Sequence, residues 1–345
     1  MKQNPLSADL HHILDHTREL WEDLRGARLF ITGGTGFFGC WLLESFLFAN
    51  RQLDLKASAS VLTRRPDSVK QTLPHLMLDP AVTLHEGDVR NFEFPKGEYS
   101  HIIHAATETS HQLEILEPLD KFTANIEGTR RVLDFVLTSG TSKFLFTSSG
   151  AVYGKQPSDM THIPEYYLGA PETNDLTTAY GQSKRTSEFL CTTYAKKYGF
   201  QATIARCFAF VGPRLPLDAN YAIGNFIRDA IKGNPIQING DGTPFRSYLY
   251  AADLAIWLWT ILFKGQSIYP YNVGSENDLT IAQLAFTIVK ELAPTATIQV
   301  AKQPVFQQPV SRYVPSTQRA KQDLKLETWI PLNEAIRRTA DFYKS

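Results

Sequence analysis

Residues 28–39 read Arg28-Leu-Phe-Ile-Thr-Gly-Gly-Thr-Gly-Phe-Phe-Gly39, and this stretch decides the fold of the chain. Residues 28–32 are a short apolar run rich in β-forming side chains, as expected for a buried parallel strand. The run 40–48 is apolar enough for a buried helix. A strand, a glycine turn and a helix together form the context in which a dinucleotide pyrophosphate binds. The stretch therefore predicts a nucleotide-binding unit.

The three glycines of this stretch follow one another at three-residue spacing, and each has its own expected role. Gly33 takes the tight turn, Gly36 lets the backbone approach the pyrophosphate, and Gly39 lets the helix pack on the strand. The spacing is Gly-x-x-Gly-x-x-Gly, which differs from the Gly-x-Gly-x-x-Gly of most dehydrogenases. The residues expected to contact the cofactor in this loop are Gly33, Thr35, Gly36, Phe37, Phe38 and Gly39.

The composition bounds the class of protein. With 345 residues, of which 43% are hydrophobic, the chain can bury a large core and form one domain plus a lobe, or two domains. The formal net charge is zero and no long basic run occurs, so nothing supports binding to nucleic acid or to a membrane surface. No apolar run reaches the ~18 residues of a membrane span, and no signal-peptide pattern opens the sequence. We therefore expect a cytoplasmic protein.

The three cysteines are scattered without metal-ligand spacing, which suits a reducing compartment and fits neither disulfides nor a zinc site. His12 and His16 lie four residues apart, but no third ligand is near them in sequence. We interpret them as part of a solvated helix face and expect no metal site.

Strands alternate with helices across residues 28–206, which predicts an α/β fold with a doubly wound parallel sheet. Residues 1–25 are expected to form an amphipathic helix, capped by Ser7 or Asp9. Residues 26–210 form the predicted Rossmann domain, to which segments around 239–275 return, and 211–345 form mainly a smaller substrate-binding lobe. The expected strands are 28–32, 57–63, 82–89, 101–106, 143–147 and 201–206, and the later helices lie near 220–232, 251–264, 279–292 and 331–343.

The residues after the second and third strands bear on the choice of cofactor. In an NAD-binding unit an acidic residue at the end of the second strand holds the ribose 2′-OH. Here Thr63 ends that strand and Arg64 and Arg65 follow, so a forked guanidinium can pair with a 2′-phosphate. Asp88 is placed to meet an adenine amino group. The sequence favours NADP and leaves NAD open.

The stretch Tyr180-Gly-Gln-Ser-Lys184 carries the predicted chemistry. Tyrosine and lysine at i and i+4 share one helix face. A tyrosine has a pKa of ~10, and lowering it by about three units takes roughly 4 kcal/mol, which an ammonium and a nicotinamide cation in a desolvated cleft are expected to supply. Tyr180 then exchanges a proton with a sugar hydroxyl or a ketone while a hydride moves at the same carbon, and Ser149 hydrogen-bonds the same oxygen.

These motifs together resemble the extended short-chain dehydrogenases/reductases of the NAD(P)-dependent nucleotide-sugar epimerase/dehydratase family, over roughly residues 26–340. The resemblance implies a nucleotide-diphosphate sugar as substrate and catalysis by Ser149, Tyr180 and Lys184. Dimerisation through the helices near 122–138 and 177–198 is also implied. Further implied cofactor contacts are Asp88, Val89, Ala105, Ala106, Thr107 and Asn125, with Tyr180 and Lys184, and the implied substrate contacts are Ser148, Ser149, Asn225, Arg246 and, more weakly, Arg312. By contrast, His104 at the end of the fourth strand is interpreted as a structural hydrogen-bonding residue.

Two departures from the family pattern bear on the type of reaction and on the binding of the diphosphate. Family 4,6-dehydratases carry Asp-Glu after the catalytic threonine, and decarboxylases carry a Ser-Glu pair at this place, whereas Gly150 and Ala151 follow Ser149 here. Without that carboxylate, dehydration and decarboxylation are disfavoured, and 4-keto reduction or 4-epimerisation is favoured. Ala209 stands where the family usually has a diphosphate-binding asparagine. Two alternatives stay open, a reductase of a smaller non-sugar ketone or aldehyde and a non-enzymatic NADP-sensing protein.

Overall fold

The computed structural model describes residues 4–107, 118–219, 221–305 and 309–344. At its centre lies a seven-stranded sheet in the order β11-β6-β5-β4-β1-β2-β3, in which every pair of neighbours is parallel. The prediction of a doubly wound parallel sheet is confirmed. Its strands are β1 (Arg28–Thr32), β2 (Ser58–Thr63), β3 (Val82–Glu86), β4 (His101–His104), β5 (Lys143–Ser149), β6 (Gln201–Cys207) and β11 (Pro270–Val273).

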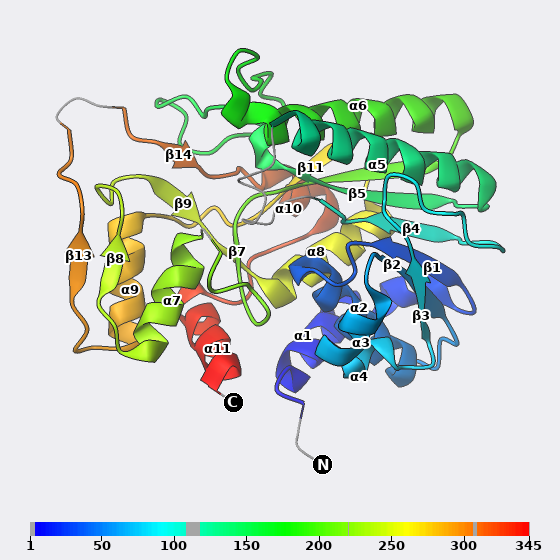
Figure 1. The fold of residues 1–345 in the computed structure, drawn as a ribbon, viewed down its shortest axis with the longest axis horizontal. Coiled ribbons are helices and arrows are strands. Elements are labelled where there is room, and N and C mark those ends of the chain that lie inside the picture. Colours follow the sequence, from blue (N-terminus) through cyan, green and yellow to red (C-terminus); the bar gives the residue numbers. More distant parts are fainter. Residues whose placement is uncertain (1–3, 108–117, 220, 306–308, 345) are drawn as a thin grey trace.

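Helices cover both faces of this sheet (Figure 1). On one face α5 (Pro118–Thr138) and α6 (Ala179–Tyr198) pack against each other and against β4 and β5. On the other face lie α1 (Ser7–Thr17), α2 (Phe37–Gln52) and α8 (Ala251–Lys264). Residues 251–263 of α8 are all buried, because this helix is apolar on every side and is enclosed by the sheet and its neighbouring helices. The segment 251–273 thus adds a core helix and the edge strand β11 to the sheet.

The remaining chain forms a smaller lobe beside the sheet and short connecting elements (Figure 1). The predicted later helices are confirmed as α7 (Ala222–Lys232), α8, α9 (Ile281–Leu292) and α11 (Leu332–Lys344). Three small sheets join β7 (Phe210–Val211) to β10 (Leu249–Tyr250), β8 (Ile236–Ile238) to β13 (Ile298–Val300), and β9 (Phe245–Ser247) to β12 (Asp278–Thr280) and β14 (Arg312–Tyr313). The other helices are α3 (Pro66–Thr72), α4 (Pro74–Met77), α10 (Gln318–Leu324) and the 3₁₀ turns Arg18–Leu24, Gly150–Tyr153 and Leu176–Thr178.

The N-terminal helix begins differently from the prediction. Leu6 occupies the cap position and neither Ser7 nor Asp9 caps the helix with its side chain. Asp9 is instead buried, accepts a 2.7 Å hydrogen bond from the Tyr250 hydroxyl and pairs with Arg338 of α11. The predicted cap is therefore wrong, because the carboxylate is engaged by partners that are distant in sequence. Among the described helices, none is long and apolar enough to cross a membrane.

Candidate active site

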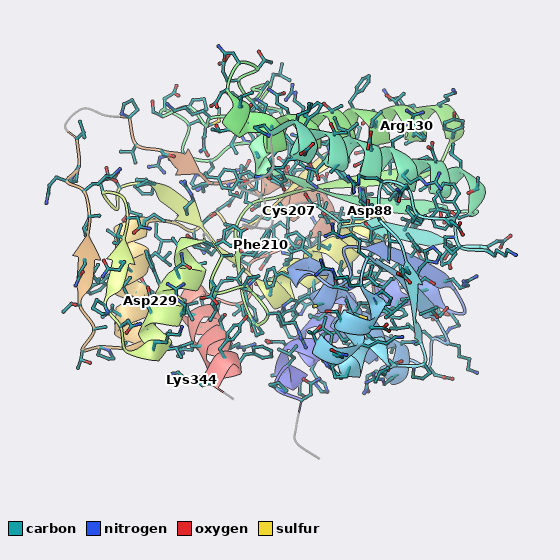
Figure 2. All side chains as sticks on the ribbon, viewed as in Figure 1. Asp88, Arg130, Cys207, Phe210, Asp229 and Lys344 are labelled. Carbon is teal, nitrogen blue, oxygen red and sulfur yellow. The ribbon has the colours of Figure 1, made fainter. Side chains whose placement is uncertain are left out.

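A large cleft opens where β1, β4 and β5 end, with the sheet domain on one side and the smaller lobe on the other. Strand order reverses between β1 and β4, and ligands of open α/β sheets bind at such a point. Asp88 and Cys207, both of which line the cleft, are labelled in Figure 2. The predicted site residues that line it are Gly33, Thr35, Gly36, Phe37, Phe38, Arg64, Asp88, Val89, Ala105, Ala106, Thr107, Asn125, Ser148, Ser149, Tyr180, Lys184 and Arg246.

The glycine turn has the geometry that a pyrophosphate needs. Gly33 has a φ of +72°, and a Cβ there would lie 2.5 Å from the carbonyl carbon of Ala105. Gly36 is the cap residue of α2, and a Cβ there would meet only the Gly33 oxygen at 3.5 Å. The space before the helix N-terminus is thus open, and unpaired N–H groups face it. Gly39 does not line the cleft; a Cβ there would lie 2.2 Å from the Gly33 oxygen, so this glycine allows α2 to pack on the turn.

Three arginines that follow strands β2 and β3 line the cleft: Arg64, Arg65 and Arg90. Asp88 accepts hydrogen bonds from Arg90 Nε at 2.8 Å and Nη2 at 3.0 Å, and these bonds lower the pKa of its carboxyl group. Sequence reasoning missed Arg90, although its place two residues after Asp88 was a usable signal. Strand β2 ends in Thr63 and is followed by Arg64 and Arg65, so no acidic residue ends this strand.

In the middle of the cleft, His104 and Asn125 hold neighbouring strands and helices together through hydrogen bonds. His104 exchanges hydrogen bonds with Thr32 at 2.7 Å and Thr129 at 3.1 Å, and burial lowers its pKa to about 3. The structural interpretation of His104 is confirmed by these bonds. Asn125 accepts from the Thr107 hydroxyl at 3.2 Å and donates to Ser183 Oγ at 3.0 Å. Ser183 lies one turn below Tyr180, so Asn125 supports the start of α6.

Ser149, Tyr180 and Lys184 meet in this cleft from the end of β5 and from α6. Lys184 is 2% exposed and its Nζ donates a 2.8 Å hydrogen bond to the Thr147 carbonyl. Burial lowers the pKa of Lys184 to about 8. Ser149 is buried and accepts a hydrogen bond from the Ala151 N–H at 3.2 Å.

In the protein alone, the surroundings of Tyr180 raise the pKa of its hydroxyl. Burial raises its pKa, Tyr313 raises it further, and hydrogen bonds with Ser149 and Thr107 offset only part of the effect. The lowering expected from Lys184 together with a nicotinamide cation concerns the cofactor-bound site and stays a prediction; in the protein alone Lys184 is bonded to Thr147, and Tyr180 is partly buried in the cleft. Tyr180 is a phenol here, which is the proton-donating form.

The smaller lobe contributes a tyrosine that sequence reasoning missed. The Tyr313 hydroxyl lies 3.4 Å from Ser149 Oγ, and its ring packs on Phe208 at a centroid distance of 4.7 Å. The neighbouring Arg312, which was the predicted ligand, does not line the cleft; it pairs with Asp278 at 2.6 Å and lies 3.8 Å from the Phe245 ring centroid. Successive side chains of a strand point to opposite faces, so β14 directs Tyr313, and not Arg312, to the cleft.

Two other predicted substrate contacts are engaged by the protein itself. Asn225 does not line the cleft; in the amide orientation that satisfies its neighbours, it donates to the carbonyls of Leu217 and Ala219 at 2.9 Å. It therefore holds the loop whose residues Asp218 and Ala219 do line the cleft. Ser148 lines the cleft, but its hydroxyl donates to the buried Glu188 at 2.5 Å.

The lining of the cleft contains few acidic groups. Among the described residues that line the cleft, the carboxylates are Asp88, Asp120 and Asp218. A Cβ on Gly150 would lie 2.7 Å from the Phe208 ring and 2.8 Å from the Tyr313 hydroxyl. The space beside Ser149 is thus occupied by aromatic groups, so a larger residue cannot be placed there without displacing them.

The described residues contain no group of three or more His, Cys, Asp or Glu side chains that is placed to bind a metal. His12 is not on a solvated face as interpreted from the sequence. Its Nε2 lies 3.1 Å from Asp253 Oδ1, and its ring packs against Trp329.

Comparison with known proteins agrees with this geometry. A model of the NAD-dependent epimerase/dehydratase family matches residues 29–274. The chain is 31% identical over 318 residues to UDP-glucuronic acid decarboxylase 1 of Arabidopsis thaliana, a match that covers 91% of this chain and 69% of that protein. UDP-glucuronic acid decarboxylase 1 of Danio rerio is 27% identical over 316 residues, covering 92% of this chain and 72% of the relative.

Solved structures share the fold. UDP-glucose 4-epimerase of Thermotoga maritima, solved with UDP-glucose, superposes with a TM-score of 0.76 at 22% identity, covering 92% of this chain and 98% of that one. A dTDP-glucose 4,6-dehydratase of Streptomyces venezuelae, solved with NAD, gives a TM-score of 0.76 at 22% identity and covers 92% and 97% of the two chains. At this level of identity the likeness concerns the arrangement of the chain.

Proposed function

The chain belongs to the NAD-dependent epimerase/dehydratase family, and we propose that it is an NAD(P)-dependent enzyme that acts at C4 of a nucleotide-activated sugar, by 4-keto reduction or 4-epimerisation. One observation carries this proposal: Ser149, Tyr180 and Lys184 line the same cleft as the glycine turn of Gly33 and Gly36. That cleft brings groups suited to a dinucleotide beside groups suited to proton transfer.

Tyr180, Ser149 and Lys184 each have a separate role in the proposed reaction. A nicotinamide held in this cleft would supply or accept the hydride. Tyr180, whose phenol form is favoured by burial, gives its proton to the ketone oxygen and becomes a phenolate. In the reverse direction that phenolate takes the proton of the sugar hydroxyl. Ser149 hydrogen-bonds the same oxygen. Lys184 is fixed by the Thr147 carbonyl, and its positive charge stabilises the negative charge that develops on Tyr180 when the proton leaves.

The environment of Ser149 supports reduction or epimerisation over elimination of water or carbon dioxide. An acid or base placed directly after Ser149 would serve those eliminations, but Gly150 and Ala151 occupy these positions. Phe208 and Tyr313 fill the space next to Gly150.

NADP is the proposed cofactor, because Arg64 lines the cleft directly after β2 and no acidic residue ends that strand. The test is to purify the protein without added cofactor, denature it and identify any released nucleotide by mass. An empty site that binds NADPH more tightly than NADH supports a reductase. Tightly retained NAD(H) supports an epimerase that recycles its own hydride and contradicts the role given to Arg64.

One set of observations favours a second candidate, a reductase of a smaller non-sugar ketone or aldehyde. Ala209 replaces the usual asparagine, Arg312 is paired with Asp278, and Asn225 is bonded to loop carbonyls. Arg246 is then the main candidate for the diphosphate, and it lines the cleft. A nucleotide-sugar enzyme should lose most of its substrate affinity in Arg246→Ala, whereas an enzyme that acts on a small ketone should tolerate this change.

We also propose that two chains associate through α5 and α6. These helices lie side by side on one face of the sheet, and Phe189 and Tyr198 of α6 are 69% and 48% exposed. Exposed aromatic side chains of this kind are enriched at protein interfaces. Light scattering should give the mass of a dimer, and Phe189→Asp should shift the protein toward the monomer. A wild-type monomer would contradict this arrangement.

A further inference from the structure

We propose that Tyr313, which comes from the smaller lobe, is a positioning residue that holds the Ser149 hydroxyl in the orientation needed for proton transfer. The inference rests on the proposed function, because it assigns a role in the same reaction. It adds a fourth residue to the three that the sequence indicated.

The first support is the place of Tyr313 in the fold. Strand β14 pairs with β9 in parallel, and Tyr313 lies opposite Arg246 in this register. Paired residues of neighbouring strands present their side chains on the same face. Both side chains accordingly line the cleft, Arg246 as the candidate phosphate ligand and Tyr313 beside Ser149. The strand pair therefore links the binding of substrate to the group that assists proton transfer.

The second support is the hydrogen-bonding capacity of Ser149. A serine hydroxyl has one hydrogen to donate and can accept two hydrogen bonds. The Ala151 N–H occupies one acceptor position at 3.2 Å, and the Tyr313 hydroxyl, 3.4 Å away, is placed to occupy the other. With both acceptor positions filled, the one hydrogen of Ser149 is left for Tyr180, which is within hydrogen-bonding reach, or for the oxygen of a bound substrate.

The opposite direction of the hydrogen bond between Tyr313 and Ser149 leads to a different expected result. The Tyr313 hydroxyl is also placed to donate to the Cys207 carbonyl at 3.5 Å, so this carbonyl competes with Ser149 Oγ for the one hydrogen of Tyr313. If Tyr313 donated only to that carbonyl, it would accept the hydrogen of Ser149 and withdraw it from the reacting oxygen. Removing the Tyr313 hydroxyl would then leave turnover unchanged or raise it, whereas the proposed arrangement requires that turnover fall.

The surroundings keep the Tyr313 ring in place and keep its hydrogen on the oxygen. The ring packs on Phe208 with 36° between the two planes, and both residues lie against Gly150. Burial raises the pKa of Tyr313 to about 12, so the hydroxyl remains a donor throughout the neutral range. The absence of a side chain at position 150 is what allows the hydroxyl to come so close to Ser149.

The first arm of the test needs no substrate. Thermal unfolding is measured for wild type, Ser149→Ala, Tyr313→Phe and the double variant. If the two hydroxyls are hydrogen-bonded to each other, the melting temperature of the double variant falls by less than the sum of the decreases in the two single variants. The matched control is Tyr153→Phe, which removes another buried tyrosine hydroxyl, bonded to Asn272 at 2.8 Å, and whose effect should add to that of Ser149→Ala. Additive losses for Tyr313 and Ser149 would overturn the proposal.

The second arm measures turnover with NADPH and 4-keto nucleotide sugars as probes. Tyr313→Phe should lower kcat about tenfold with KM nearly unchanged, which is the size expected for one misdirected hydrogen bond. In the Ser149→Ala background the same change should have no further effect on kcat. An unchanged or raised kcat, or a rise in KM alone, would contradict the positioning role. If wild type turns over no probe, the proposed function fails, while the unfolding cycle still decides whether Tyr313 holds Ser149.

Discussion

The Nζ of Lys184 lies 5.9 Å from the centroid of the Tyr180 ring, and it donates its hydrogen bond to the Thr147 carbonyl at 2.8 Å. Lys184 is therefore attached to the strand that carries Ser149, which couples α6 to the end of β5. Because burial raises the pKa of Tyr180, the tyrosine holds its proton at neutral pH. Before the reaction, the Tyr180 hydroxyl is therefore a proton donor, which is the role that reduction of a ketone requires.

Replacing Tyr180 by phenylalanine should lower turnover by two or more orders of magnitude, as expected for loss of a general acid (about 10²–10⁴-fold). The affinity for the cofactor should change only a few-fold, because the ring remains. Steady-state kinetics and a cofactor titration check both statements. Unchanged turnover would remove Tyr180 from the proton transfer.

Two glycine substitutions should separate binding from folding. In Gly36→Ala the new Cβ has room within the protein, with only the Gly33 oxygen at 3.5 Å, but it occupies the space before the helix N-terminus. We expect an unchanged melting temperature and an affinity for NADPH lowered by about tenfold or more. In Gly39→Ala the Cβ would lie 2.2 Å from a backbone oxygen, so the protein should be strongly destabilised. Normal NADPH binding by Gly36→Ala would argue against a pyrophosphate at this turn.

Arg64→Ala should weaken binding of NADPH and leave binding of NADH nearly the same, because only NADPH carries the 2′-phosphate. A charge-assisted bond of this kind is worth about 1.5–3 kcal/mol, or roughly 10- to 150-fold in affinity. Fluorescence titrations of the two cofactors against wild type and variant give the comparison directly. If the affinities for both cofactors fall equally, Arg64 does not bind the 2′-phosphate.

Acid should destabilise the protein through its buried neutral histidines. Burial lowers the pKa of His104 from its usual 6.5 to about 3 and that of His101 to about 4. Above pH 6.5 the folded and unfolded states are both neutral at His104, so no stability is lost there. Between pH 6.5 and about 3 the unfolded chain binds a proton that the folded chain does not, so the free energy of unfolding falls as the pH falls.

The contribution of His104 can be isolated by His104→Asn. Each such histidine contributes up to ~1.4 kcal/mol per pH unit in this window. The variant should be less stable than wild type near neutral pH, because it loses the bonds to Thr32 and Thr129, but its stability should depend less on pH. Urea unfolding at about pH 7.5 and about pH 5 measures both effects. Equal pH dependence in the two proteins would show that His104 is not the group concerned.

The sequence predicted what is local in the chain. The glycine turn, the alternation of strands with helices and the Tyr180–Lys184 spacing depend on neighbours within a few residues, so the sheet and one wall of the site could be inferred. Contacts between segments that are distant in the sequence could not be inferred. Asp9 was expected at a helix cap but is bonded to Tyr250 and Arg338. Arg312 was expected in the cleft, but the register of β14 brings its neighbour Tyr313 there.

The most direct test of the account is a single-turnover measurement of nicotinamide absorbance. The cofactor-loaded protein is mixed with a nucleotide sugar, either a 4-keto sugar with NADPH or a 4-hydroxy sugar with the oxidised cofactor, and Tyr180→Phe is measured in parallel. We expect the absorbance to change in wild type and to change at least a hundredfold more slowly in the variant, as for loss of a general acid (about 10²–10⁴-fold). No change with any nucleotide sugar, or equal rates in both proteins, would contradict hydride transfer at the sugar through Tyr180.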